Sequence, residues 1–389
     1  MRTQRPIRLA EDTIARDELE SLATWMLAGN RLTKAEQTIE FELEFADWIS
    51  SRHAIYVNSG SSANLLMVAA LKEAGRLRNN NAIAAGVSWV TTVSPFLQLG
   101  FNVQLADCET TSLGLDLNHV EDLCRRCKPS VLILVHVLGH CGDMNSVREI
   151  CQRYGVILLE DSCEALGSSY KGKKLGTFGA AGSFSFYYGH HISTIEGGMV
   201  ITDDDELHQI MLSLRSHGWS RDLNPQVRQL LVNKYDVDEF RDLYTFYHAG
   251  FNLRSTDLQA FLGRSQLRKL DLIITRRNEN FETYRKALPE FFCQMGANDI
   301  ISSFAYGTLV KNRLETFRYI RELNIESRPL ICGNIARHPF WIRDHPALEL
   351  SNADKVHDYG MYLPNHHLLN ESDILRVADA FASVAVPYF

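Results

Sequence analysis

The 389-residue sequence has little of several features that define whole classes of protein. It holds only eight cysteines, too few for a disulfide framework, which indicates free thiols and a cytoplasmic location. Acidic residues outnumber basic ones, 47 to 40, and the net charge of −7 argues against a nucleic-acid partner. The longest apolar runs, such as residues 131–138, are far shorter than the roughly 18 residues of a membrane span. The first residues, MRTQRPIRLAED, lack the apolar segment of a secretory signal, so neither export nor membrane insertion is expected.

The composition is that of a globular protein, because 45% of the residues are apolar and 22% are charged. Short β-rich runs alternate with helical patterns. The predicted strands span residues 54–57, 82–85, 102–106, 131–137, 156–160, 183–187 and 198–202, and the predicted helices span residues 62–74, 116–126, 144–153 and 205–216. This alternation predicts an α/β fold with a mostly parallel central sheet.

The alternation fades after about residue 255, and the length suits two or three domains. We therefore predict a large domain over residues 1–255, with an N-terminal helix indicated by the apolar spacing within residues 12–28. Residues 256–389 are predicted to form a smaller C-terminal α/β domain that is helical up to about residue 290. Residues 220–245 have the character of an insertion outside the core.

Two polar segments follow predicted strands. Residues 58–64, NSGSSAN, lie between a strand and a helix, where small residues and free N–H groups can hold a phosphate. An ordinary N-capped helix start is the alternative. Residues 158–164, LLEDSCE, end an apolar strand in acids. At the carboxyl end of a parallel strand Asp161 would face the ligand crevice, and a helix cap or solvated turn is the alternative.

Two more segments carry polar residues of interest. Residues 182–198, GSFSFYYGHHISTIEGG, run from a strand through His190 and His191 to a Gly-Gly turn and another strand. Adjacent histidines point in different directions, so at most one of them is expected to serve a site, and a structural pair is the alternative. Residues 250–254, GFNLR, place a polar pair before a helix, which alone indicates little.

In their order and spacing these segments resemble the DegT/DnrJ/EryC1 family, the sugar-modifying branch of the fold-type I aminotransferases that depend on vitamin B6. The resemblance covers nearly the whole chain and rests on GNRLTKAEQTIEFELEFADW, VNSGSSANLL, GVSWVTT, LLEDSCEALGSSYKGKKLGTFG, GSFSFYYGHHISTIEGGMVITDDDEL, RSHGW, GFNLRSTDLQAFLG and SRPL. It implies an aspartate aminotransferase-like fold in which the large domain binds the cofactor.

One departure from the family pattern bears on function. Family aminotransferases carry their Schiff-base lysine six residues before the Glu of the Glu-Gly-Gly turn. That Glu is Glu196 here, and the corresponding position is His190. No shift of register supplies a lysine, because none occurs between Lys174 and Lys234. Imidazole cannot form a stable Schiff base, but it transfers protons near neutral pH.

In having a histidine at the lysine position, the sequence resembles the deoxysugar 3-dehydratases of the family, which are of two kinds. One acts on a CDP-sugar and needs an iron–sulfur cluster and a reductase. The other, the GDP-4-keto-6-deoxymannose 3-dehydratases of the colitose pathway in lipopolysaccharide O-antigen synthesis, has no cluster. Cys163 matches one cluster position, but the stretch after Arg215, SHGWSRDL, holds no cysteine, and a cluster needs about four thiolates. The sequence resembles the cluster-free kind, so no metal and no iron–sulfur reductase is expected.

The resemblance implies pyridoxal phosphate as cofactor, working as pyridoxamine phosphate, with L-glutamate as amino donor and a nucleotide-linked 4-keto-6-deoxysugar as substrate. It implies that His190 is the proton-transferring base and that Asp161 pairs with the pyridinium nitrogen. It also implies a homodimer with shared active sites, in which Asn252 reaches the phosphate of the neighbouring subunit. The resemblance further implies that Gly60, Ser61 and Ser185 bind the cofactor phosphate and that Trp89 stacks on the cofactor ring. Glu164, where the family usually has Gln, is implied to lie near the ring hydroxyl.

Three arginines, Arg221, Arg254 and Arg328, are candidates for the nucleotide diphosphate or the glutamate carboxylate, since arginine binds both through paired hydrogen bonds. Ordinary ion pairs are the alternative. His217 and His366 are weaker candidates. Three functions stay open: a 3-dehydratase that removes the C3 hydroxyl and releases ammonia, a nucleotide-sugar aminotransferase with an atypical base, and an inactive homologue with a binding or regulatory role. The sequence also leaves GDP, CDP and dTDP open.

Overall fold

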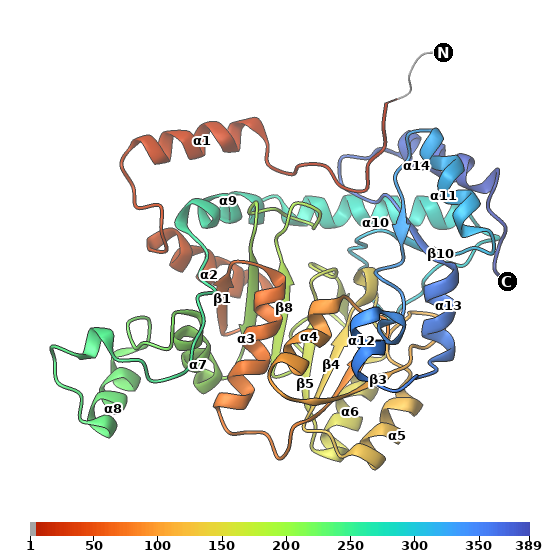
Figure 1. Cartoon of the computed structure of the whole chain (residues 1–389). Coiled ribbons are helices and arrows are strands. Elements are labelled where there is room, and N and C mark those ends of the chain that lie inside the picture. Colours follow the sequence, from red (N-terminus) through yellow and green to blue (C-terminus); the bar gives the residue numbers. More distant parts are fainter. Residues whose placement is uncertain (1–4) are drawn as a thin grey trace.

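The computed structural model describes residues 5–389 and centres on a seven-stranded sheet (Figure 1). Across the sheet the strands are β1 (His53–Val57), β9 (Gly198–Thr202), β8 (Ala181–Ser185), β5 (Ile157–Asp161), β4 (Val131–Val135), β2 (Asn81–Ala85) and β3 (Asn102–Ala106). Only β9 runs against its two neighbours, and the other pairs are parallel. The predicted α/β class with a mostly parallel sheet is confirmed, and each predicted strand matches an observed one to within two residues.

Helices cover both faces of this sheet (Figure 1). They are α2 (Glu36–Ile49), α3 (Gly60–Glu73), α4 (Val90–Gln98), α5 (Leu117–Cys127), α6 (Met144–Tyr154) and α7 (Asp205–Arg215). Local chemistry sets several ends. Asp116 and Asp143 accept hydrogen bonds from the first N–H groups of α5 and α6, and α6 ends at Gly155, whose φ of 62° suits glycine.

Two helices of the large sheet region lie where no helix was predicted. In α2 the residues Thr38, Phe41, Phe45 and Ile49 form a buried stripe at helical spacing. Helix α4 begins with β-branched residues and contains Pro95, both unfavourable for a helix. Burial of its apolar side against the sheet outweighs this local preference, a tertiary effect that a single sequence does not reveal.

After residue 255 the chain forms α9 (Asp257–Leu267) and the long α10 (Leu270–Ala287). These two helices confirm the predicted helical stretch up to about residue 290. A second sheet follows, in the order β10 (Tyr306–Leu309), β12 (Gly360–Leu363) and β11 (Arg328–Pro329), all antiparallel. Its helices are α11 (Arg313–Glu322), α12 (Pro339–Asp344), α13 (Ser351–Tyr359) and α14 (Glu371–Ala382). A small hairpin, β6 (Ser169–Tyr170) with β7 (Lys173–Lys174), completes the strands. The domain boundary at residue 255 stays a prediction.

Helix α8 (Pro225–Tyr235) extends from the body in Figure 1, whereas α1 (Arg16–Leu27) lies along α9, with Trp25 stacked on Phe261. Helix α8 lies within the predicted insertion of residues 220–245 and has no buried residue. No helix within residues 5–389 has both the length and the apolar character needed to cross a membrane.

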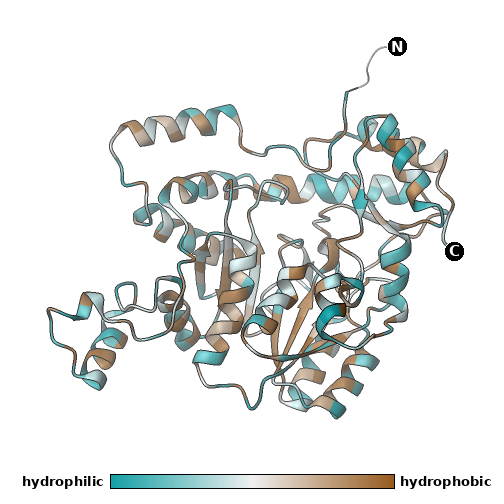
Figure 2. Ribbon diagram, in the orientation of Figure 1, coloured by the Kyte–Doolittle hydropathy of each residue, from teal (hydrophilic) through white to brown (hydrophobic). Residues whose placement is uncertain are grey.

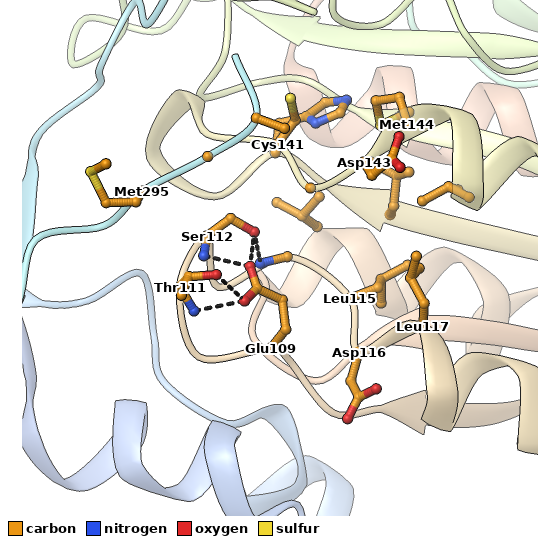
Figure 3. Close-up of a pocket in the computed structure, with 18 of the residues that line it drawn as sticks. Glu109, Thr111, Ser112, Leu115, Asp116, Leu117, Cys141, Asp143, Met144 and Met295 are labelled. Atoms are coloured by element: carbon orange, nitrogen blue, oxygen red, sulfur yellow. Dashed lines mark hydrogen bonds between the residues drawn. The ribbon is translucent and has the colours of Figure 1, made fainter.

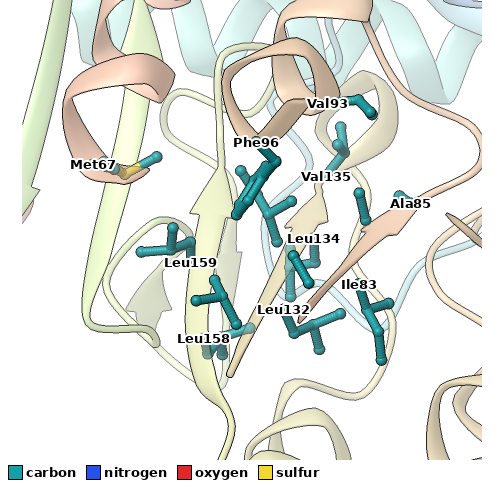
Figure 4. Close-up of a cluster of buried hydrophobic side chains, with 14 of the residues drawn as sticks. Met67, Ile83, Ala85, Val93, Phe96, Leu132, Leu134, Val135, Leu158 and Leu159 are labelled. Atoms are coloured by element: carbon teal, nitrogen blue, oxygen red, sulfur yellow. The ribbon is translucent and has the colours of Figure 1, made fainter. Parts of the chain in front are cut away.

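The core follows the hydropathy of the sequence: the strands are brown inside the molecule, and the outer helix surfaces are largely teal (Figure 2). One cluster packs Ile83, Leu132 and Leu159 of the sheet against Met67 of α3 and Phe96 of α4 (Figure 4). A second cluster lies between the sheet and the α2, α9 and α10 helices, and a third fills the C-terminal part. Each large side chain so buried contributes roughly 1.5–3 kcal/mol.

A buried carboxylate fixes the end of β5. Glu160 is fully buried and accepts hydrogen bonds from the backbone N–H groups of Gly176 (2.9 Å), Phe178 (2.5 Å) and Gly179 (2.7 Å). Its Oε2 also lies 2.9 Å from Nε2 of His136, at the end of β4. One side chain therefore ties the loop of residues 176–179 to two central strands, next to Asp161.

We expect Glu160→Ala to lower the free energy of unfolding by about 3 kcal/mol or more. The change leaves three buried N–H groups without an acceptor, and each such group costs about 1–3 kcal/mol. Urea denaturation followed by circular dichroism measures the loss. Glu290→Ala, at an exposed acid in the C-terminal part, is the matched control. A loss below about 1 kcal/mol for Glu160→Ala would show that the loop is held by other contacts.

Candidate active site

A cavity of about 310 Å³ opens where β4, β5 and β8 end and α3 begins. Carboxyl ends of parallel strands meet at one edge of a sheet, which is where ligands bind in open α/β sheets. Eight residues singled out in the sequence line this cavity together: Gly60, Ser61, Trp89, Asp161, Glu164, Ser185, His190 and Arg328.

Asp161 lies on the cavity floor in a dense set of hydrogen bonds. Its Oδ2 accepts from Asn64 Nδ2 (2.8 Å) and from Thr92 Oγ1 (2.7 Å), and its Oδ1 accepts from the N–H of Cys163 (3.2 Å). Asn64 is held in turn by Ser183, whose hydroxyl donates to its Oδ1 (2.7 Å). These donors orient a carboxylate that is almost fully buried and leave it able to pair with a cationic ring nitrogen.

The NSGSSAN segment forms the start of α3 at one end of the cavity. Ser59 caps the helix by accepting from the N–H of Ser62 (3.0 Å), so the capped helix start is confirmed, and phosphate binding by the segment stays a prediction. The N–H groups of Gly60 and Ser61 have no partner within a helix and lie at its positive end, a favourable place for an anion. A Cβ at position 60 would lie 2.7 Å from Cβ of Ser185, so glycine keeps this corner open.

The two histidines face different surroundings. His191 is fully buried, and its Nε2 donates to the carbonyl oxygen of Ser302 (2.9 Å), which gives it a structural place. His190 lines the cavity and packs against Phe304, and its Nδ1 has no hydrogen-bond partner within residues 5–389. Burial lowers the pKa of His190 to about 4, and the positive charge of Arg277 acts in the same direction. At neutral pH His190 is therefore uncharged and ready to accept a proton.

Glu164 is the second acid of the cavity. Its Oε2 accepts from the N–H of Leu138 (2.9 Å). Burial raises the pKa of this carboxyl to about 7, and the negative charge of Asp161 adds to the effect. A carboxyl group that titrates near neutral pH inside a cavity is typical of functional sites.

Four other residues singled out in the sequence lie outside the lining of this cavity, and three of them contact one another. Arg254 donates to Oδ1 of Asn252 (3.1 Å) and to Nε2 of His217 (3.1 Å). Arg221 donates twice to the carbonyl oxygen of Leu243 and packs on the rings of Trp219 and Tyr244. His366 is also absent from the lining. The cofactor and substrate contacts predicted for these residues therefore stay predictions.

A larger cavity of about 450 Å³ lies between the starts of α5 and α6 (Figure 3). Its acids are already used by the fold: Glu109 accepts from the N–H and hydroxyl groups of Thr111 and Ser112, and Asp116 and Asp143 cap helices. The acids of this cavity are therefore not available to a ligand, in contrast to His190 in the smaller cavity, whose Nδ1 has no hydrogen-bond partner within the described residues. Among residues 5–389 no group of three or more His, Cys, Asp or Glu side chains is arranged to hold a metal ion.

Comparison with known proteins agrees with this geometry. The model of the DegT/DnrJ/EryC1/StrS aminotransferase family matches residues 13–382. The chain belongs to this family. Fold-type I architecture is thereby confirmed, and the family aligns over both sheets.

Within the family, similarity is high to 3-dehydratases. The GDP-4-keto-6-deoxy-D-mannose 3-dehydratase of Yersinia pseudotuberculosis is 32% identical over 92% of this chain and 94% of its own length. The dTDP-4-dehydro-2,6-dideoxy-D-glucose 3-dehydratase of Saccharopolyspora spinosa is 32% identical over 97% of this chain and 86% of its own. A crystal structure of GDP-4-keto-6-deoxymannose-3-dehydratase with a trapped PLP-glutamate geminal diamine has a TM-score of 0.88 at 28% identity, covering 96% of this chain and all of that chain.

Sequence reasoning missed several residues that shape the cavity. Asn64 and Thr92 hold Asp161, and Phe304 packs on His190 from the C-terminal part. Asn64 and Thr92 both lie in quoted motifs, NSGSSAN and GVSWVTT, so their polar character beside a buried acid was an available signal. Phe304 lies in a loop without a motif, and only the folded chain brings it to His190.

We expect binding of added pyridoxal phosphate to weaken between pH 6 and pH 8, by up to about tenfold per pH unit above the pKa. Below about pH 7 Glu164 is protonated and can donate to a ring oxygen, and above that pH its charge repels the oxygen. Glu164→Gln should make affinity nearly independent of pH in this range, because an amide does not ionise. Absorbance titration of the apoprotein measures the dissociation constant, with Glu290→Gln as control. Equal pH dependence in both variants would assign the titration to another group.

Proposed function

We propose that this chain is a pyridoxal phosphate-dependent GDP-4-keto-6-deoxymannose 3-dehydratase that uses L-glutamate as amino donor and releases ammonia. The observation that carries the proposal is His190: a neutral imidazole lies in a cavity with the acid and anion-binding groups of the family, at the position of the family's lysine. Two GDP-4-keto-6-deoxy-D-mannose 3-dehydratases, each 32% identical over 92% of this chain, support the same assignment. The dTDP-sugar 3-dehydratase supports the reaction but not the nucleotide.

The residues of the cavity fit the cofactor group by group. The Asp161 carboxylate suits the pyridinium nitrogen, and the start of α3 with Ser185 suits the phosphate. Trp89 is 53% exposed at the cavity edge, so its ring face is available for stacking. When bound as pyridoxamine phosphate, the group supplies an amine for the sugar ketone at C4 and a ring that accepts electrons while the C3 hydroxyl leaves.

His190 has the properties of the general base in this scheme. With a pKa near 4 it is unprotonated at neutral pH, and Nδ1 is free to hold a proton. Arg277 raises the energy of the protonated ring, so the proton is readily passed on, and the C3 hydroxyl is its chemically sensible acceptor because hydroxide is a poor leaving group. A lysine at this position would instead capture the cofactor and favour transamination.

A homodimer with shared active sites is part of the proposal. Asn252, His217 and Arg254 contact one another without lining the active-site cavity of their own chain, which supports a role toward a neighbouring subunit. Arg221 lies outside that cavity as well and packs on the same Trp219 ring as Arg254. Helix α1 and the insertion of residues 220–245 carry exposed apolar side chains, among them Leu27, Phe240 and Tyr244 at 88%, 88% and 72% exposure. Such side chains favour burial against a second copy. Eight free cysteines support the proposed cytoplasmic location.

Incubation with cofactor, L-glutamate and a panel of GDP-, CDP- and dTDP-linked 4-keto-6-deoxysugars tests the proposal. We expect the GDP-sugar to lose its C3 hydroxyl in mass spectra, with ammonia and 2-oxoglutarate formed in equal amounts. The reaction should proceed in air with a chelator, since Cys163 is the one cysteine that lines the cavity. Nitrogen retained in the sugar would indicate an aminotransferase, a need for a reductase would indicate the cluster-bearing kind, and no turnover would favour the binding homologue.

The His190→Lys variant tests the base assignment. We expect borohydride to fix the cofactor covalently to this variant and to leave it dialysable in the parent, because only an amine condenses with the aldehyde. Dehydration should fall by a factor of about 100 or more, within the usual contribution of a general base.

His191→Asn is the matched comparison, and it should affect stability more than turnover, since His191 contacts Ser302 and not the cavity. Loss of turnover with His191→Asn but not with His190→Asn would move the base by one residue. Borohydride-fixed cofactor in the parent protein would contradict the assignment of position 190.

A further inference from the structure

A buried arginine lies behind His190, outside the lining of the active-site cavity. This residue, Arg277 of α10, is 2% exposed. Burial lowers the pKa of its guanidinium to about 9, so the group is still charged at neutral pH. No acid within residues 5–389 forms an ion pair with it, whereas its exposed neighbour Arg276 pairs with Glu279 (3.3 Å). A buried charge without a counter-charge is costly, which indicates that this one serves a purpose beyond packing.

The guanidinium of Arg277 binds carbonyl oxygens from three separate segments of the chain. Its Nη1 donates to the carbonyl oxygens of Phe304 (2.9 Å), Ser303 (3.3 Å) and Asn365. Its Nη2 donates to the carbonyl oxygen of His190 (3.4 Å). One side chain thereby joins the loop between β8 and β9, which carries His190, to the loop before β10 and to the turn after β12. The planar fork of arginine presents several donors in fixed directions, which a single ammonium group does not.

The helix that carries Arg277 is itself fastened to the turn after β12. Asn280 donates to the carbonyl oxygen of His366 (3.2 Å), and Tyr284 donates to that of Pro364 (2.9 Å). Positions 277, 280 and 284 lie on one face of α10, because neighbours on a helix face are three or four residues apart. The guanidinium is therefore presented from a rigid support and can fix the groups that it binds.

The loop before β10 contacts both histidines of the catalytic segment. Phe304 packs on His190 with ring centres 5.2 Å apart, and the carbonyl oxygen of Ser302 accepts from His191 (2.9 Å). Since Arg277 binds the backbone on both sides of the contact between Phe304 and His190, it holds the two rings in one arrangement. The direction in which the imidazole of His190 faces the cavity therefore depends on Arg277.

Carbonyl oxygens satisfy the donors of Arg277 but do not cancel its charge. Burial lowers the pKa values of four histidines around it, and the charge of Arg277 acts in the same direction on each. These histidines are His190, His191, His366 and His367. A carboxylate partner would offset the charge, so the use of carbonyl acceptors helps to keep the imidazole of His190 neutral.

Other groups act on His190 from the remaining elements around it. Asp161 at the end of β5 and a hydrogen bond to the backbone of Cys163 favour its protonated form. The other titratable side chains that line the same cavity are Glu164, Tyr187, Glu196 and Arg328. Because a substitution at position 277 leaves all of these in place, a change in the protonation of His190 reports the loss of the guanidinium.

We infer that Arg277 is a positioning residue of the proposed reaction, which fixes His190 against Phe304 through its fork and keeps the imidazole unprotonated through its uncancelled charge. The inference rests on the proposed function for the step that it serves, and it assigns a role to a residue that does not line the cavity. Fork and charge are separable, because Arg277→Lys keeps a cationic group without the fork and Arg277→Met removes both.

Nuclear magnetic resonance of the cofactor-loaded protein, with histidine labelled at Cε1, measures the protonation of His190. His190→Asn removes one signal and so assigns it. We expect Arg277→Met to raise the pKa of His190 by about one unit or more, the usual effect of removing a nearby like charge. Arg277→Lys should raise it less, because the amine keeps a charge at this place. The acid limb of the kcat–pH profile should move with the pKa of His190.

Turnover assays test the effect of the fork. Both variants should lower kcat at pH 7.5 about tenfold, because the base is no longer held at the proton that it removes. KM for the sugar nucleotide and for glutamate should stay within twofold of the parent, since no side chain that lines the cavity is changed. Arg276→Met, at the exposed neighbour on the same helix, is the matched control and should agree with the parent in every measurement. Assays well below the thermal midpoint of each variant separate these effects from loss of fold.

An unchanged pKa of His190 or an unchanged acid limb in Arg277→Met would overturn the inference, because Arg277 would then be a purely structural residue. A kcat within twofold of the parent in Arg277→Lys would overturn it as well, and this variant alone decides if Arg277→Met does not fold. A raised pKa of His190 in a protein without dehydratase activity would keep the link between the two residues and reject the proposed function.

Discussion

The site depends on the two adjacent acids that end β5. Glu160 and Asp161 point to opposite sides of the strand, as successive strand residues must. Glu160 binds the loop of residues 176–179 and lies against His136, which locks the end of the sheet. Asp161 is thereby presented to the cavity at a fixed place, where Asn64 and Thr92 orient it. One of two neighbouring side chains thus stabilises the fold, and the other lines the cavity, where we propose that it pairs with the cofactor.

Burial then decides the chemistry of the other groups around the cavity. The same desolvation that keeps His190 neutral raises the pKa of Glu164, so a base and a protonated acid face one space near pH 7. Arg277 reinforces the first effect and Asp161 the second. A lysine amine at position 190 would place a positive charge in the cavity. That charge would favour the ionised form of Glu164 and so lower the pKa of this carboxyl. The histidine therefore changes the protonation of the cavity as well as removing a Schiff-base partner.

The sequence predicted the elements that follow a local sequence pattern, such as a run of apolar residues or a motif. Alternating apolar runs gave all seven strands of the large sheet, and motif order led to eight residues that now line one cavity. It did not reveal α4, because Pro95 and β-branched residues disfavour a helix that burial alone maintains. Nor did it separate Arg328, which lines the cavity, from Arg221 and Arg254, which do not. Arginines look alike in a sequence, and only their tertiary partners tell them apart.

The C-terminal part acts on the site through contacts that are distant in sequence. Phe304 packs on His190, Arg328 borders the cavity from β11, and the N-terminal segment is fastened to residues 324–326 before it reaches Tyr188. Phe304 and Arg328 of the C-terminal part therefore form one wall of the cavity, while the ends of β4, β5 and β8 form the other. Residues from both parts of the fold line the cavity, so a substitution in either part can change its shape and charge.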